Sequence, residues 1–149
     1  MPSEPMTPLS ILVVDDDETS LAIIAALLES HGHNVTTQDT GFGTSRRILR
    51  DKPDVVVLDI EMPGLNGDDI IKLLRETATR RSVRNATMPS FVLYSGRDID
   101  ELQRLAKETG AIGAISKAIG HKTFLAEFNR VMRSHHANVT SAGRTSGAR

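Results

Sequence analysis

Residues 55–64 read VVVLDIEMPG: four apolar residues run without a break into the carboxylate of Asp59, and a Met-Pro-Gly turn follows. An unbroken apolar run is typical of a strand that is covered on both faces, as in a parallel sheet flanked by helices. Two further runs have the same character, ILVV at 11–14 and FVLY at 91–94. The three runs predict the buried centre of a parallel sheet, and Asp59 ends one of its strands.

Weaker segments complete this pattern. NVTTQ at 34–38 alternates and is half polar, as an edge strand is, whereas AIGAIS at 111–116 is apolar but contains glycine. The alternation of strands with helical patterns predicts an α/β fold, a (βα)5 doubly wound five-stranded parallel sheet. The helical periodicities cover residues 21–28, 44–50, 70–74, 99–106 and 124–132.

Composition limits the class of protein. The 149 residues carry 18 basic and 19 acidic side chains, so the charge gives no reason to expect binding to nucleic acid or to an anionic membrane. The absence of cysteine excludes disulfides, thiolate metal sites and a cysteine nucleophile. With no signal peptide and no membrane-length apolar run, we expect a cytoplasmic protein. One domain is expected over 9–134, with disordered tails at 1–8 and 135–149.

Polar residues that could form a site follow the predicted strands. In an open parallel sheet, ligands bind beyond the carboxyl ends of the strands. Two carboxylates 4 Å apart repel by about 4 kcal/mol at an effective dielectric of about 20, so a cluster of them suits a hard cation, and oxygen ligands alone favour Mg²⁺. A lysine and a hydroxyl beside it would complete a pocket for a phosphoryl group. The residues at the strand ends are Asp15, Asp16, Asp17, Asp59, Ser95 and Lys117.

Over about residues 9–134 the chain resembles the receiver domain of two-component response regulators, the CheY-like family. The resemblance rests on the acidic pair after ILVV, the segment VVVLDIEMPGLNG, the Ser-Gly after FVLY and the Lys after GAIS. It implies a flavodoxin-like fold with strand order 2-1-3-4-5. It also implies a signalling switch and not an enzyme, with self-phosphorylation from a donor and autodephosphorylation as its only chemistry.

The resemblance assigns roles to the acidic residues. Asp59 would be the phosphoacceptor, receiving the group from a sensor histidine kinase or a histidine phosphotransfer protein. Asp16 and Asp59 would ligate Mg²⁺ directly, Asp15 through a water molecule, and Glu61 through its backbone carbonyl.

Switching and output are implied in the same way. Lys117 would pair with the phosphoryl oxygens, and Ser95 would move toward them. Because about fifteen polar residues follow the last predicted helix, we expect a stand-alone receiver whose output is protein–protein binding at the surface of the fourth helix, fifth strand and fifth helix.

Two positions depart from the family pattern. Lys117 is followed by Ala118 where the family usually has a proline with a cis peptide bond. A cis bond without proline costs about 2.5–4 kcal/mol, so we predict a trans bond. Ala114 occupies the position of an aromatic residue in many members, and strand alternation predicts that Tyr94, the only tyrosine, points to the face opposite Ser95.

Two further features lie outside the core motif. Glu61 stands two residues after Asp59, and Arg97 stands two residues after Ser95. We hypothesise that Glu61 and Arg97 pair across the mouth of the predicted site and obstruct the water that would hydrolyse the acyl phosphate. The segment before the fourth strand is longer than usual in the family. Its three arginines, Arg80, Arg81 and Arg84, predict a solvated helix face or a basic loop.

Three alternatives stay open. Ala114 and Ala118 are compatible with a degenerate receiver that acts without phosphorylation. Residues 15–19 also match the D-x-D-x-T pattern of haloacid-dehalogenase-like phosphohydrolases, with Asp15 as nucleophile and Asp17 as acid/base, although the only acid after the lysine is Glu127. For Asp17 we prefer the role of N-cap of the first helix to a metal role. A flavodoxin-like FMN binder is disfavoured, since three aspartates occupy its phosphate loop.

Overall fold

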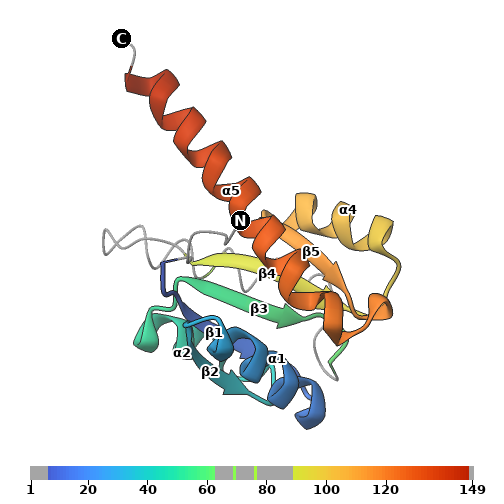
Figure 1. The fold of residues 1–149 in the computed structure, drawn as a ribbon. Coiled ribbons are helices and arrows are strands. Elements are labelled where there is room, and N and C mark those ends of the chain that lie inside the picture. Colours follow the sequence, from blue (N-terminus) through green and yellow to red (C-terminus); the bar gives the residue numbers. More distant parts are fainter. Residues whose placement is uncertain (1–6, 63–68, 70–75, 77–88, 148–149) are drawn as a thin grey trace.

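The computed structural model, which describes residues 7–62, 69, 76 and 89–147, contains a five-stranded parallel sheet (Figure 1). Its strand order is β2-β1-β3-β4-β5, as predicted. β3 is buried over its whole length, which explains its unbroken apolar run, and β2 is an edge strand with a largely exposed polar pattern. The strands are β1 Ser10–Val14, β2 Asn34–Gln38, β3 Val55–Asp59, β4 Ser90–Ser95 and β5 Gly113–Ser116.

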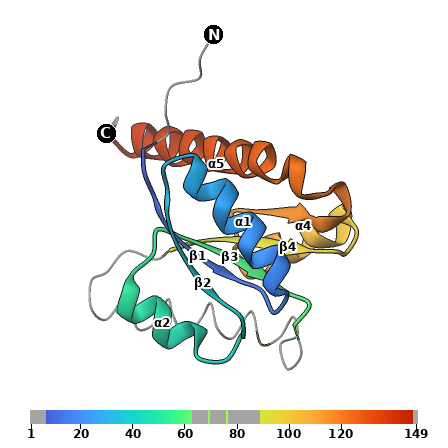
Figure 2. The ribbon, with the colours of Figure 1, turned by 60° about the horizontal axis from the view of Figure 1, so that its bottom comes forward.

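Helices cover both faces of the sheet (Figure 2). α1 and α5 pack on one face, and α2 and α4 pack on the other. The predicted helix over 70–74 and the arginines Arg80, Arg81 and Arg84 lie outside the described residues. The helices are α1 Glu18–Ser30, α2 Thr44–Asp51, α4 Ile99–Thr109 and α5 Phe124–Gly147, with 3-10 turns η1 Lys117–Ile119 and η2 His121–Thr123.

The core is divided by the sheet into two apolar layers. Ile24 and Phe128 are fully buried in the layer under α1 and α5. Ile48 and Leu102 are fully buried in the layer under α2 and α4. Successive residues of β4 enter alternate layers, as the pleat of a strand requires. Tyr94 consequently lies in the α1/α5 layer, on the face predicted for it.

Both ends of α1 have the backbone geometry of helix termini. The side chain of Asp17 accepts a hydrogen bond of 3.1 Å from the backbone N–H of Thr19, which is the N-cap geometry. Beyond the last turn, Gly32 has φ of 88°, a left-handed conformation that favours glycine. The N-cap predicted at Asp17 is confirmed.

The packing of α5 against β5 requires the glycine at position 113. A Cβ atom at this position would lie 2.7 Å from a methyl carbon of Val131 on α5, which is too close for a real contact. The missing side chain lets α5 pack directly against the strand. The glycine that interrupts the apolar pattern of β5 is thus a packing requirement.

The C-terminal helix is longer than predicted. A disordered tail was expected from residue 135, but α5 continues to Gly147, and Figure 1 shows its distal part extending beyond the sheet. A helix that already exists grows by one hydrogen bond per added residue without a new nucleation cost. Residues 135–147 contain no proline to stop it, so a polar composition alone was a poor guide.

Candidate functional site

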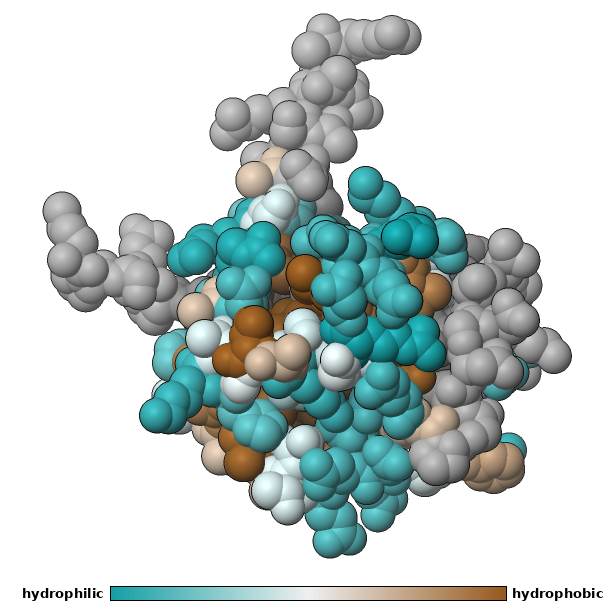
Figure 3. All heavy atoms as spheres, turned by 90° about the vertical axis from the view of Figure 1, so that its right-hand side faces the viewer, coloured by the Kyte–Doolittle hydropathy of each residue, from teal (hydrophilic) through white to brown (hydrophobic). Residues whose placement is uncertain are grey.

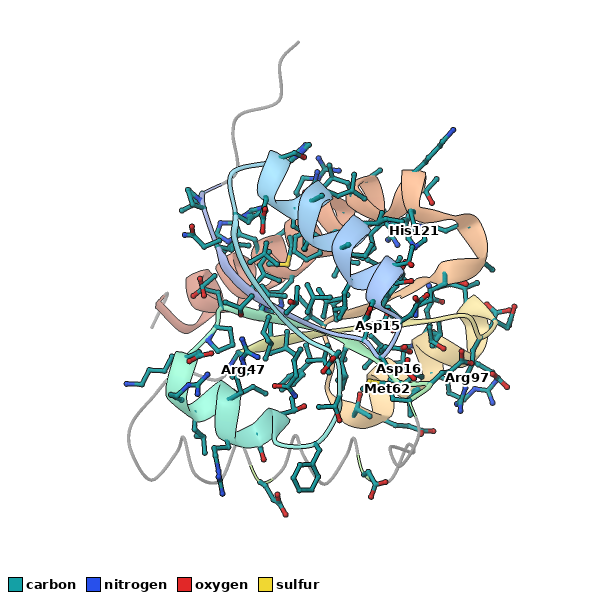
Figure 4. The ribbon with its side chains drawn as sticks, turned by 90° about the horizontal axis from the view of Figure 1, so that it is seen from below. Asp15, Asp16, Arg47, Met62, Arg97 and His121 are labelled. Carbon is teal, nitrogen blue, oxygen red and sulfur yellow. The ribbon has the colours of Figure 1, made fainter. Side chains whose placement is uncertain are left out.

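The strand ends bring the predicted site residues to one edge of the sheet. Figure 4 shows Asp15 and Asp16 at the same end of the molecule as Met62 and Arg97, whereas Arg47 lies apart on α2. In the register of the sheet, Asp59 is paired with Tyr94 and Ser95 is paired with Ser116. This convergence follows from parallel pairing, since all strands then end at the same edge.

Three carboxylates form a cluster at this edge. One oxygen from each of Asp15, Asp16 and Asp59 lies within 4.8 Å of the others, with Asp16 exposed and the other two buried. Backbone N–H groups fix the buried pair: Asp59 Oδ1 accepts from Glu61 at 2.9 Å, and Asp15 Oδ1 accepts from Asp17 at 3.0 Å. An all-oxygen donor set with one exposed member fits Mg²⁺, which keeps several waters.

Lys117 lies against the same cluster. Its ammonium donates to Asp15 Oδ2 at 2.8 Å and to Asp59 Oδ2 at 3.2 Å. Burial lowers the pKa of Lys117, but the hydrogen bonds and charges of the two aspartates outweigh it and raise the pKa above its ordinary value. The lysine is therefore charged at neutral pH and offsets part of the carboxylate repulsion.

The electrostatics of Asp59 favour a bound cation. Burial, together with the side chain and charge of Asp15, raises the pKa of Asp59 to about 6, against the opposing effects of the Glu61 N–H and Lys117. The ionised form at neutral pH is thus destabilised in the folded protein. A divalent cation at the cluster would relieve this penalty.

A pair of buried serines connects the loops around Lys117. Ser95 Oγ accepts from the backbone N–H of Arg97 at 3.2 Å. Ser116 Oγ donates to the carbonyl of Arg97 at 3.2 Å and accepts from the N–H of Ala118 at 3.2 Å. No peptide bond between described residues is cis, so the predicted trans bond after Lys117 is confirmed.

Ser116 is a structural residue of the site that the sequence motifs do not reveal. Its position just before the lysine makes it the N-cap of η1, and its side chain ties the β5–α5 loop to the loop after β4. A serine at the end of a strand is a general capping signal, and here it gives the loop a fixed shape without proline.

Glu61 and Arg97 lie together at the mouth of the site. Arg97 Nε is 3.6 Å from Glu61 Oε1, with both side chains nearly half exposed. The expected pairing is present in the structure. An exposed ion pair of this kind contributes little to the stability of the fold, about 0–1 kcal/mol. Any role of the pair therefore follows from its position at the mouth of the site.

Two side chains do not join the site. Asp17 is engaged as the cap of α1, where Ser20 Oγ also donates to it at 3.0 Å. Glu127 lies on α5 and pairs with Arg130 at 2.7 Å. The acid/base and metal roles that a haloacid-dehalogenase-like reading needs are therefore not supported by these residues.

The surroundings of the site are mainly polar. Figure 3 shows the end of the molecule toward which the strands run, where hydrophilic side chains surround small hydrophobic areas. Ile99 and Ile119 are among the large apolar residues exposed in the described part of the chain, at 37% and 50%. None of the helices described by the structure is long and apolar enough to cross a membrane.

Comparison with known proteins gives a consistent result. A family model for the response regulator receiver domain matches residues 11–129. Protein PilH of Pseudomonas aeruginosa is 31% identical over 122 residues, which is 82% of this chain and 96% of PilH. Transcriptional regulatory protein KdpE of Mycobacterium tuberculosis is 32% identical over 128 residues, 85% of this chain and 52% of KdpE, so the chain spans about half of that regulator.

Solved structures agree. The BeF3-activated N-terminal receiver domain of Klebsiella pneumoniae RstA matches with a TM-score of 0.62 at 32% identity, covering 83% of this chain and 97% of that one. Vibrio cholerae CheY4 matches with a TM-score of 0.68 at 21% identity, covering 84% and 99%, and shows the same fold.

The fold and the sequence matches point to one family. The sheet has the order β2-β1-β3-β4-β5, and its carboxyl edge holds an acidic cluster of the kind at which receiver domains bind Mg²⁺. The family model covers most of the chain, and a relative above 30% identity is covered almost completely. The chain therefore belongs to the receiver domain family of two-component response regulators, which are phosphorylation-dependent signalling switches and not classical enzymes.

Proposed function

We propose that Asp59 accepts a phosphoryl group from a histidine of a sensor kinase or a phosphotransfer protein. The observation that carries this proposal is the contact of Lys117 with two buried carboxylates, at 2.8 Å and 3.2 Å, beside an exposed third one. Asp59 is the member that ends the central strand β3, so a rigid element presents it. The arrangement offers an acceptor, a cation and a place for a metal within one small pocket.

The transfer step is a displacement at phosphorus. A carboxylate oxygen of Asp59 forms a bond to phosphorus while the bond from phosphorus to the donor imidazole nitrogen breaks. The nitrogen keeps the electron pair and takes up a proton, giving neutral imidazole and an acyl phosphate. Lys117 follows the incoming oxygens because they carry more negative charge than the carboxylate it contacts in the free protein.

Mg²⁺ would be held by Asp16 and Asp59, by Asp15 through a water molecule, and by the backbone carbonyl of Glu61. When bound, it neutralises charge on the phosphoryl oxygens and on the acidic cluster. The donor set of carboxylate oxygens fits this ion, as the geometry of the cluster indicates. The metal-free protein uses the Lys117 ammonium for part of the same task.

The output is proposed to be protein–protein binding at the face of α4, β5 and α5. A groove of about 250 Å³ lies on this face, with Ala114 and Val131 in its lining and Lys107 and Arg130 among its polar residues. The attraction of the phosphoryl group for Ser95 would reshape the loop that leads into α4, because Ser95 Oγ accepts from the Arg97 N–H in the free protein. A partner segment with an apolar side chain and acidic neighbours would fit this groove.

Incubation with Mg²⁺ and a small acyl-phosphate donor, followed by intact mass measurement, tests the acceptor. We expect the gain of one phosphoryl group by the wild-type chain and none by Asp59→Ala. Asp39→Ala, an exposed aspartate just after β2, is the matched control and should gain the group normally. A gain that survives Asp59→Ala, or no gain in the wild type, would contradict the proposal, and the latter result would favour a degenerate receiver.

We expect Arg97→Ala to shorten the lifetime of the phosphorylated form. The Glu61–Arg97 pair spans the mouth of the site, so its loss opens the path of the attacking water. The rate of phosphoryl loss, followed by intact mass after removal of the donor, should rise severalfold. Arg104→Ala on the exposed side of α4 serves as the control, and an unchanged or longer lifetime in Arg97→Ala would exclude this role.

A further inference from the structure

Tyr94 lies between the phosphoryl-acceptor site and α5. The Lys117 ammonium is 5.0 Å from the centre of the Tyr94 ring, which is within cation–π distance. The same ring meets the ring of Phe124 edge-on, with centres 5.1 Å apart. Tyr94 therefore touches both the cation of the site and the first residue of α5.

The Tyr94 hydroxyl is not placed for hydrogen bonding. Tyr94 is only 1% exposed, and its hydroxyl finds no hydrogen-bond partner among the described residues. An unpartnered buried hydroxyl costs about 1–3 kcal/mol. Burial raises the pKa of Tyr94, so the hydroxyl stays neutral. The contacts that Tyr94 makes are those of its ring.

The aromatic contacts continue along the inner face of α5. Phe124 stacks on Phe128 with ring centres 6.0 Å apart, and both rings are fully buried. Phe128 in turn meets His33, just before β2, at 6.1 Å. A displaced Tyr94 ring cannot be absorbed by empty space in such a close-packed layer, so the first turns of α5 must respond.

We propose that Tyr94 is a positioning residue that couples the Lys117 ammonium to the first turns of α5. The inference rests on the proposed function, in which Lys117 leaves its contacts with Asp15 and Asp59 to follow phosphoryl oxygens. The movement changes the attraction between the ammonium and the ring, and the ring transmits the change to Phe124. α5 also contributes Val131 to the groove on the output face, so the coupling reaches that surface.

The opposite face of the sheet, under α2 and α4, offers a poorer route for coupling the site to a helix. Ala114 lies in the layer under α4 and has a single methyl group, which cannot change rotamer. Tyr94 is the only tyrosine of the chain, and its layer is the one that contains α5. The aromatic contact with the site is thus on the α1/α5 side.

The sequence supplies a specific probe for this coupling. With one tyrosine and no tryptophan, the intrinsic fluorescence of the protein reports Tyr94. Mg²⁺ with beryllofluoride, a tetrahedral mimic of a phosphoryl group, should change this emission, whereas Mg²⁺ alone or addition to Asp59→Ala should not reproduce the change. Hydrogen exchange of amides 124–131 should change by about fivefold or more on binding, the lower end of typical coupling between sites.

Variants separate coupling from packing. Tyr94→Leu should abolish the exchange response of residues 124–131 and change the affinity for beryllofluoride about fivefold or more, because the coupling free energy then no longer contributes to binding. Tyr94→Phe keeps the ring and should retain the exchange response. Phe91→Leu removes an equally buried ring of β4 from the other layer and should leave both readouts unchanged.

The outcomes distinguish this inference from the proposed function. If the wild-type chain gains a phosphoryl group on Asp59 but neither tyrosine emission nor exchange of residues 124–131 responds, the coupling is wrong and the acceptor role stands. A full response in Tyr94→Leu would also overturn the coupling. If Asp59 accepts no phosphoryl group, both fail together. The wild-type measurements decide the matter even if Tyr94→Leu does not fold.

Discussion

Replacing Lys117 with alanine is expected to lower the free energy of unfolding of the metal-free protein by about 3 kcal/mol at pH 7.5, because removing one partner leaves buried charges unpaired. The ammonium lies 2.8 Å from Asp15 and 3.2 Å from Asp59, whose side chains are 1% and 3% exposed. Without it, two buried carboxylates face each other without a counter-ion. The same variant should accept a phosphoryl group about 100-fold more slowly, since a preorganised cation near the reacting oxygens is lost.

Urea denaturation and the initial rate of phosphoryl gain would measure the two effects of Lys117→Ala. Mg²⁺ should restore part of the stability lost in Lys117→Ala, because it occupies the same acidic cluster. It should not restore the rate of phosphoryl gain. Lys122→Ala, an exposed lysine in η2, is the matched control and should change neither quantity. Wild-type stability in metal-free Lys117→Ala would mean that the ion pairs contribute nothing net to folding.

The convergence of Asp15, Asp59 and Lys117 could be predicted from the sequence because it depends only on parallel pairing. Each residue follows an apolar run, and parallel strands end at one edge whatever their detailed packing. The cap at Asp17 and the trans bond after Lys117 could be predicted for a similar reason: both depend on local chemistry alone.

Other features of the fold and the site depend on side-chain rotamers and helix length, which the apolar pattern of the sequence does not specify. The contact of Lys117 with Asp15 involves a long side chain with many rotamers. Its position is fixed by Asp15, which follows β1, by Asp59 at the end of β3 and by Tyr94 in β4. The alternation of β4 predicts on which face of the sheet Tyr94 lies, but it does not predict which cation contacts the Tyr94 ring. The length of α5 depends on helix propagation, which a polar composition does not reveal.

The pH dependence of stability should show the cost of an ionised Asp59. A pKa of about 6 in the folded protein, against the ordinary value of 3.8, corresponds to a penalty of about 3 kcal/mol at neutral pH. Below about pH 4 the carboxyl is protonated in both states, so no penalty exists there. Between about pH 4 and 6 the unfolded chain releases this proton first, and the stability of the metal-free protein falls as the pH rises.

Asp59→Asn removes this titration and is expected to stabilise the metal-free protein by about 2–3 kcal/mol at pH 7.5 and by little at pH 4. Urea unfolding across this pH range measures the difference, with Asp39→Asn as the exposed control that should follow the wild type. Mg²⁺ should narrow the gap at pH 7.5, since it stabilises the wild-type carboxylate cluster more than a cluster that has lost one ligand. An Asp59→Asn protein less stable than the wild type at pH 7.5 without metal would contradict the raised pKa. The Asp59 carboxylate would then be stabilised in its charged form before any metal or phosphoryl group binds. A cation at this edge of the sheet would in that case be needed only to offset the charge of a phosphoryl group.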